Sequence, residues 1–372
     1  MVESSHFQNW ARVIISEKLF DEIWVIPSDY PVNRLTFQSL GFNENIGCKL
    51  KVFSFPLGKR LNNIIFRLLD IVFGRKWRSV ILFRYLKRSK PNFLHFHELQ
   101  HGAYLYNPIY EYFKNRSEFR VICSTWGSDL LFYGELDSHK NELEKVFSWT
   151  ETMTAERDDD FRICEKFDYK NNFEAPVYIT VGLKAPIPNP KQLPSRRNKI
   201  LIKGYQDSHG RSLNALAALE LVDSDVSNIE IKIFSASESV KLQAEFLRCT
   251  RGWDIQVIGR TTNLEIKRHF SESRIYLGLA ISDGLSTAMV EAMANGAFPI
   301  QSMNSAAGTF LQKGISGYVV NPWNLSEIAE AIDIALRDDN LVDKAMEINI
   351  STLEKIYNYK DGVSAIRNLY SN

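Results

Sequence analysis

Short apolar runs alternate with helical stretches along the whole chain, and this alternation constrains the fold more than any other feature. The runs are rich in β-branched and aromatic residues, which is typical of strands. The expected strands are Glu22–Pro27, Leu50–Phe55, Asn92–Phe96, Phe119–Ser124, Glu151–Ala155 and Val177–Val181 in the first half, and Lys199–Lys203, Ile229–Phe234, Ile255–Ile258, Ile275–Ala280, Ala297–Gln301 and Tyr318–Val320 in the second. Strands that alternate with helices form parallel sheets covered by helices on both faces. The sequence therefore predicts the α/β class.

A proline-rich stretch divides this pattern into two halves of similar size. Four of the chain's 12 prolines fall within residues 185–198, APIPNPKQLPSRRN. Because proline fixes φ and lacks a backbone N–H, this stretch cannot form a central strand or a helix interior. With 372 residues, 45% of them hydrophobic, the chain is long enough for two cores. We predict domains over residues 1–185 and 199–355, a linker over 186–198, and a helix over 356–372 that packs back on the first domain.

The charge balance and the cysteines exclude several classes of protein. A formal net charge of +1 argues against a dedicated nucleic-acid-binding protein, since such proteins are basic throughout. The 4 cysteines are scattered without paired spacing, which fits a reducing compartment and gives no zinc signature. The N-terminal residues lack the layout of a signal peptide, and no apolar run approaches the ~20 residues of a membrane-spanning helix. We therefore expect a cytoplasmic protein without a nucleic-acid partner.

One segment departs from this even balance of charge. Residues 57–90 contain ten Lys or Arg and one acid, Asp70, interleaved with large apolar side chains. Helices that are cationic on one side and apolar on the other suit an anionic membrane surface, which would place the protein at the inner face of the cell membrane. The alternative is a pair of core-packed helices with a solvated basic face. The sequence leaves both interpretations open.

The clearest functional signal lies in residues 275–302, IYLGLAISDGLSTAMVEAMANGAFPIQS. An apolar strand ends in a polar turn that contains Asp283 and Gly284, and a helix begins near residue 286. Open parallel sheets bind ligands at the carboxyl ends of their strands, where helix N-termini present free N–H groups to phosphates. Gly284 lets the backbone approach such a ligand closely, Asp283 can hold sugar hydroxyls, and Glu291 can accept hydrogen bonds from a ribose. A plain turn with a solvated Glu291 is the alternative.

This segment resembles retaining glycosyltransferase family 4, whose members carry an acid, seven residues, and then Glu-Ala-Met-Ala-x-Gly. Here Asp283 stands seven residues before Glu291, which begins the run EAMANG. The resemblance runs from about His6 to Asn372 and is most specific between Lys203 and Asn321. It implies the GT-B fold, two Rossmann-like domains whose parallel sheets face each other across a cleft. It also implies that a nucleotide-diphosphate sugar, UDP-, GDP- or dTDP-linked, donates its sugar with retention and without a metal or another cofactor.

The resemblance assigns the donor residues. Matching positions give Asp283 the contact with the transferred sugar and Glu291 the contact with the ribose, although the family usually has Glu at the first of these positions. The family also neutralises the diphosphate with an arginine, where this chain has Tyr205, and with a lysine, where it has Arg211; Lys203 is the candidate for the missing charge. The predicted donor site comprises Lys203, Gly204, Arg211, Gly284, Leu285, Ser286, Thr287 and Glu291, with Asp283 and Arg211 as the catalytic residues.

A second group of polar residues follows two strands of the first half, and the resemblance places the acceptor there. Family members often show a histidine near Trp126, and this chain lacks it. The form Trp-Gly-Ser-Asp resembles a subgroup linked to bacterial surface polysaccharides and O-antigen. Asp129 is either an acceptor contact or a helix N-cap, and a His-x-His pair on a strand places both rings on one face. The predicted acceptor side comprises Trp126, Gly127, Asp129, His97 and His101, with His95 beside them and no metal.

The sequence thus predicts transfer of a sugar to a hydroxyl of a growing, lipid-linked bacterial glycan. Two other functions remain open. One is a nucleotide-sugar epimerase, which can share this architecture, and the other is a non-catalytic protein that binds glycans or nucleotides. The absent histidine near Trp126 and the Tyr205 substitution favour the second slightly. Family members also open with a strand and a glycine-rich loop, whereas only five residues precede His6 here, so a first strand is expected to be missing.

Overall fold

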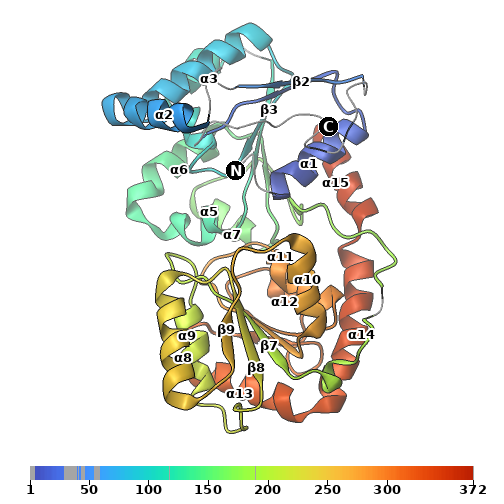
Figure 1. Ribbon diagram of the computed structural model, residues 1–372. Coiled ribbons are helices and arrows are strands. Elements are labelled where there is room, and N and C mark those ends of the chain that lie inside the picture. The colour runs from blue at the N-terminus through green and yellow to red at the C-terminus, as the bar shows by residue number, and fades with distance from the viewer. Residues whose placement is uncertain are drawn as a thin grey trace. The chain divides into compact units, whose positions relative to one another are not determined.

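The computed structural model describes residues 5–28, 40, 42, 47–53, 59–116, 118–188 and 190–371. The chain forms two compact units, which are described separately (Figure 1). Unit 1 comprises Met1–Gly182 together with Lys360–Asn372, and unit 2 comprises Leu183–Tyr359. No helix of the described residues is long and apolar enough to cross a membrane.

Unit 2 is built on one six-stranded parallel sheet, in the order β12-β11-β10-β7-β8-β9. Its strands are β7 (Lys199–Lys203), β8 (Glu230–Phe234), β9 (Ile255–Val257), β10 (Ile275–Gly278), β11 (Phe298–Ser302) and β12 (Tyr318–Val320). The chain adds β8 and β9 on one side of β7 and then returns to add the remaining three strands on the other side. This is the Rossmann strand order, and the carboxyl ends of β7 and β10 form its switch point, where such sheets bind ligands.

Helices cover the sheet of unit 2, and their first residues explain where several of them begin. The helices are η4 (Pro194–Arg196), α8 (Ser212–Leu219), α9 (Glu238–Arg251), α10 (Asn263–Glu272), α11 (Thr287–Ala294), α12 (Ala307–Phe310), α13 (Leu325–Arg337) and α14 (Asp339–Ile356). Thr262 and Glu265 form a capping box at α10, and the Asn324 side chain accepts from Glu327 N at α13, as the sequence predicts. Fully buried Ile200, Ile202 and other residues of these elements form one core.

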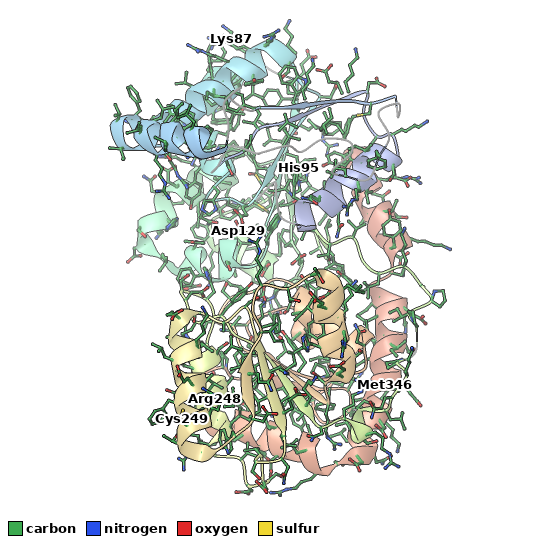
Figure 2. All side chains as sticks on the ribbon, viewed as in Figure 1. Lys87, His95, Asp129, Arg248, Cys249 and Met346 are labelled. Atoms are coloured by element: carbon green, nitrogen blue, oxygen red, sulfur yellow. The ribbon has the colours of Figure 1, made fainter. Side chains whose placement is uncertain are left out.

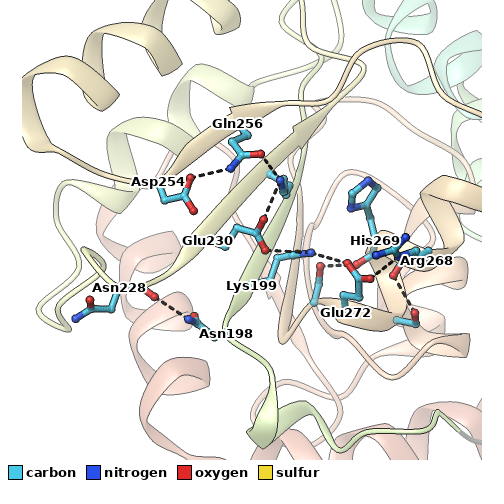
Figure 3. A network of polar contacts seen from close by, with 12 residues as sticks. Asn198, Lys199, Asn228, Glu230, Asp254, Gln256, Arg268, His269 and Glu272 are labelled. Carbon is cyan, nitrogen blue, oxygen red and sulfur yellow. Dashed lines mark hydrogen bonds and ion pairs between the residues drawn. The ribbon is translucent and has the colours of Figure 1, made fainter.

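The outer end of this sheet carries a buried lysine with two acidic partners (Figure 3). Lys199, at the start of β7, has a side chain only 9% exposed, and its Nζ lies 2.7 Å from Glu272 and 3.1 Å from Glu230. Glu272 also accepts from Arg268 at 2.6 Å. The two carboxylates compensate the buried cation and fasten α10 and β8 to β7 at the end of the sheet opposite the switch point.

Unit 1 contains a four-stranded parallel sheet in the order β3-β4-β5-β6 and a separate parallel pair, β1-β2. The strands are β1 (Glu22–Val25), β2 (Lys49–Val52), β3 (Phe93–His97), β4 (Arg120–Ser124), β5 (Thr152–Thr154) and β6 (Asn172–Glu174). The helices are α1 (Ser5–Ser16), α2 (Lys59–Phe73), α3 (Lys76–Ser89), η2 (Ala103–Leu105), α4 (Tyr110–Phe113), α5 (Ser128–Leu131), η3 (Tyr133–Glu135), α6 (Asp137–Trp149), α7 (Asp160–Lys166) and α15 (Tyr359–Ser371). The α/β class and the parallel sheets are confirmed.

One expected strand is wrong. Val177–Val181 forms no strand, and the edge strand is instead β6, a few residues earlier. Val181 adopts φ +69°, which a β-branched residue in a strand cannot have. Pro176, which offers no N–H to a neighbouring strand, separates β6 from this run. The last residues of the expected strand Leu50–Phe55, and residues 57 and 58 of the basic segment, lie outside the described residues.

The C-terminal helix α15 packs on unit 1. Its Ile366 and Leu369 are buried, and the Tyr370 hydroxyl lies 2.6 Å from His95 Nδ1 and accepts from Trp10 Nε1 at 3.2 Å. Gly362 lies so close to the backbone of Val181 that a side chain there would overlap it. The proline-rich stretch belongs to unit 2, where buried Arg197 donates to Ser273 O and Asn295 O, each at 3.0 Å.

Candidate active site

Three loops meet at the carboxyl ends of β7, β10 and β11, and we call them the donor-site loops: residues 204–211, 279–286 and 303–306. Backbone hydrogen bonds join the first loop to the second, from Arg211 N to Leu279 O at 3.1 Å and from Ile281 N to His209 O at 2.8 Å. Two more join the second to the third, from Asp283 N to Asn304 O and from Ala306 N to Gly284 O, each at 2.9 Å. The switch point is therefore lined by loops that fix one another.

Lys203 and Asp283 form an ion pair at this point. Lys203 is the last residue of β7, and its Nζ lies 3.7 Å from Asp283 Oδ2; the two side chains are 22% and 27% exposed. Burial by itself lowers the pKa of Lys203, but the Asp283 carboxylate, together with Tyr276 and Tyr205, raises it, and the pKa is raised overall. The structure thus brings together two of the predicted donor residues across neighbouring strands and keeps the lysine positively charged.

Gly204 and Arg211 bound the first loop. Gly204 packs so tightly that a Cβ there would lie 2.7 Å from Ala236 Cα and 2.7 Å from Ile233 Cγ2. Arg211 stands at the N-cap position of α8. Its guanidinium donates to Asp207 O at 2.9 Å and lies 4.6 Å from the centre of the Trp323 ring. Arg211 therefore lies at the start of α8, with its guanidinium over the Trp323 ring.

The second loop leads into α11. Ser286 is its N-cap residue and Thr287 its first residue, as the sequence predicts. Leu285 is buried beneath the loop, and the Gly284 carbonyl accepts from the third loop. Glu291, one turn into α11, is partly exposed. The predicted donor residues thus lie on two adjacent strand-to-helix junctions of one unit.

Sequence reasoning missed a buried polar layer under these loops. Tyr276 on β10 is fully buried, and burial, together with the carboxylates of Asp283 and Glu291, raises its pKa to about 12. Its hydroxyl and the Gln301 side chain both lie against Gly278, where a Cβ would overlap them. Ser302 accepts from Ala280 N at 3.2 Å. The sequence did contain a signal for this buried polar layer, namely a tyrosine and a glutamine within otherwise apolar strands.

In unit 1, Asp129 joins the loops that follow β3 and β4 (Figure 2). Asp129 is 3% exposed, and its carboxylate accepts from Leu99 N at 2.6 Å and from Trp126 N at 2.7 Å. The N-cap interpretation is wrong, because Gly127, at φ +96°, occupies the N-cap position of α5 and Asp129 lies inside the helix. Only glycine adopts this φ readily, so Gly127 has a conformational role.

The histidines lie at the end of β3. The rings of His95 and His97 stack with centroids 4.2 Å apart, so the prediction that they share one face is confirmed. His95 Nε2 lies 2.7 Å from Ser124 Oγ, and His97 packs edge-on against Trp126 at 6.1 Å. Burial lowers the pKa of His97 to about 3, so both rings are neutral. His101 Nδ1 lies 2.7 Å from Glu98 Oε2. Within the described ranges, no group of three His, Cys, Asp or Glu could hold a metal ion.

Replacing Asp129 with asparagine is expected to cost about 1–3 kcal/mol, because Leu99 N and Trp126 N donate to different carboxylate oxygens and the amide NH₂ that replaces one of these oxygens cannot accept. Burial, and then the charge of Glu98, raises the pKa of Asp129 to about 7 from 3.8. A raised pKa means that its contribution to stability is present below 3.8 and is lost as the pH rises through 7. Thermal unfolding from pH 4 to 8 should therefore show wild type losing stability relative to the variant. Parallel curves would contradict this assignment.

The described fold and the sequence resemble those of known proteins. A family model described as "Glycosyl transferases group 1" matches residues 185–351. The poly(glycerol-phosphate) alpha-glucosyltransferase of Bacillus subtilis (strain 168) is 23% identical over 226 residues, which are 60% of this chain. The present chain spans about a third (32%) of that protein's length.

Solved structures show the same fold at low sequence identity. Sucrose-phosphate synthase from Thermosynechococcus elongatus matches with a TM-score of 0.70 at 13% identity, over 94% of this chain and 88% of that one. Anabaena HepE, solved in complex with UDP and glucose, also matches with a TM-score of 0.70, at 9% identity, over 99% of this chain and 96% of that one. The expected GT-B architecture of Rossmann-like units with parallel sheets is therefore confirmed.

Proposed function

We propose that this chain, whose residues 185–351 match the glycosyl transferases group 1, moves a hexose from a nucleotide-diphosphate donor to a hydroxyl of a bacterial cell-surface polymer. The observation that carries this proposal is the meeting of Lys203 and Asp283 at the Rossmann switch point of unit 2, 3.7 Å apart. A cation and an acid at this place suit a ligand that carries both a diphosphate and a sugar.

In the proposed donor site, different parts of the ligand bind at the two strand-to-helix junctions. Lys203 and Arg211 neutralise the diphosphate, because negative charge develops there as the sugar leaves and fixed cations lower the barrier. Asp283 holds hydroxyls of the transferred sugar, and Glu291 accepts from the ribose. Lys203 exchanges part of its contact with Asp283 for the phosphate when the donor binds. The UDP and glucose in the HepE complex support a uridine nucleotide as the first donor to test.

The proposed acceptor carries free hydroxyls on a phosphate-containing or glycan polymer. The Bacillus relative is named for a poly(glycerol-phosphate) acceptor, which supports this choice. Trp126 and His101 are the proposed acceptor contacts. The backbone N–H of Trp126 donates to Asp129, and the His101 ring contacts Glu98. A lipid-linked acceptor and retention of the anomeric configuration also form part of the proposal, and both follow from the sequence resemblance.

A donor panel and a transfer assay test the proposal. UDP-, GDP- and dTDP-hexoses should be compared by thermal shift, and the stabilising donor incubated with poly(glycerol phosphate) and with lipid-linked glycan. We expect transfer with release of nucleoside diphosphate, and a product whose anomeric signal by NMR matches that of the donor. Glu291→Ala should weaken donor binding about 10- to 100-fold, as loss of a charged hydrogen bond would. The exposed Glu245 on α9 gives a matched control, Glu245→Ala, that should bind like wild type.

Three outcomes would refute this function. An isomerised sugar formed from donor alone would indicate an epimerase. Donor binding without transfer to any acceptor hydroxyl would indicate a binding protein, and unchanged donor affinity in Glu291→Ala would remove the assignment of the site.

A further inference from the structure

Helix α2 has two apolar faces, and only one of them is packed. On the inner face, Phe66 is 3% exposed and meets the Trp77 ring edge-on at 4.9 Å. Asp70 accepts from Trp77 Nε1 at 2.8 Å and pairs with Arg78 Nη2 at 2.6 Å. Arg78 is buried and also donates to Ser28 O. These contacts fix α2 against α3 at the edge of unit 1, where Figure 1 shows the two helices side by side.

On the opposite face of α2, the large apolar side chains that the structure describes are exposed. We call Leu61, Ile64, Leu68, Ile71 and Val72 the outer stripe; they are 50%, 53%, 54%, 79% and 67% exposed. Their spacing of three and four residues places them on one side of the helix. A continuous stripe of large apolar side chains costs solvation free energy in water, and such a surface marks an interaction site.

The surroundings of the outer stripe are strongly basic. Arg67 stands three residues after Ile64 and four before Ile71, so it borders the stripe on the helix surface. Exposed Arg75 and Lys76 follow the helix. Exposed cations also lie on the neighbouring helix α3: Arg84, Lys87 and Arg88; Lys87, labelled in Figure 2, lies over the rings of Phe83 and Tyr112. Asp70, the one acid of residues 57–90, is already paired with Arg78.

We infer that the outer stripe inserts into the headgroup region of an anionic lipid bilayer. Apolar side chains gain free energy when they leave water for the bilayer, and lysine or arginine residues near an anionic surface add electrostatic attraction. A helix as short as α2 is about 22 Å long, less than the ~30 Å hydrocarbon core, so it lies along the surface. The basic residues that border the stripe favour an anionic surface as its partner. They disfavour a second copy of this chain, because two stripes in contact would bring their cations together.

This inference goes beyond sugar transfer and is tested separately from it. Purified protein is sedimented with phosphatidylcholine vesicles and with vesicles containing phosphatidylglycerol. Wild type should bind the anionic vesicles at least about tenfold more strongly, and salt at 1 M, where the Debye length is about 3 Å, should abolish the difference. The variant Leu68→Gln/Ile71→Gln should lose at least about tenfold of this binding, because both side chains insert.

Two controls make the result specific. Leu242 and Phe246 form a comparable exposed pair on α9, 62% and 58% exposed, so Leu242→Gln/Phe246→Gln should bind vesicles like wild type. Donor affinity should be unchanged in both double variants, which separates loss of membrane binding from loss of the donor site. Equal binding of wild type to both kinds of vesicle would overturn the inference. So would unchanged binding of Leu68→Gln/Ile71→Gln, or a dimer of wild type that this variant disperses while neither binds vesicles.

Discussion

Replacing Lys203 with methionine is expected to lower kcat/KM for sugar transfer by about 100- to 1000-fold, as loss of one fixed charge-stabilising group does elsewhere. This corresponds to about 3–4 kcal/mol of transition-state stabilisation. The physical reason is that Lys203 keeps its charge beside Asp283 despite partial burial, since the carboxylate raises its pKa. In the proposed donor complex this fixed cation faces the leaving diphosphate and needs no reorganisation during the reaction.

The measurement is steady-state transfer kinetics with the donor that the thermal-shift panel identifies. Lys203→Arg keeps the charge and should retain most of the rate. Lys232→Met, at a lysine on β8 that pairs with Glu230 away from the switch point, should behave like wild type. A rate for Lys203→Met within threefold of wild type would show that the diphosphate does not use this cation.

Replacing Gly204 with alanine should destabilise unit 2 by about 2–3 kcal/mol, because overpacking a filled position forces backbone and side chains apart. The added Cβ would meet backbone and a β-branched side chain, Ala236 Cα and Ile233 Cγ2, both at 2.7 Å, and none of these atoms can swing away. For a unit of this size the melting temperature should fall by about 5–10 °C. Gly204 therefore has a packing role in addition to any contact with the donor.

Differential scanning calorimetry checks this, with Gly259→Ala as the control. Gly259 has open space where a Cβ would stand and should tolerate the change. If Gly204→Ala has the same melting temperature as wild type, the packing around β7 and β8 is looser than described.

The second half of the chain could be predicted closely because local pattern and tertiary structure agree there. The runs at β7 and β12 were expected with the bounds observed, since β7 is an apolar run ended by a lysine on each side and β12 is an apolar run between Gly317 and Asn321. The strand-to-helix junction that carries Asp283 and Glu291 could also be predicted, because its apolar strand, polar turn and helix follow one another directly in the sequence; that it binds a donor stays a prediction. The pairing of Lys203 with Asp283 could not, because it requires β10 to return beside β7 after two other strands.

Unit 1 was less predictable for a related reason. The role of Asp129 depends on Leu99 N, 30 residues away along the chain, and no local pattern distinguishes this contact from a helix cap. Val177–Val181 has the composition of a strand, but Val181 adopts φ +69° and its backbone lies against Gly362 of the C-terminal helix, a contact that no local pattern predicts. The basic segment left two interpretations open. The structure shows that α3 supplies Leu82 and Leu86 to the core, while α2 exposes its outer stripe; binding to a membrane surface stays a prediction.

The position of α15 has a consequence for how the protein is made. The helix that covers His95 and Trp10 of unit 1 is translated after every residue of unit 2. During synthesis, unit 1 therefore lacks the helix that covers its histidine and tryptophan until unit 2 has left the ribosome. An expression fragment that stops at residue 182 would lack the covering helix permanently. A circular permutant that starts near residue 360 would have this helix synthesised first.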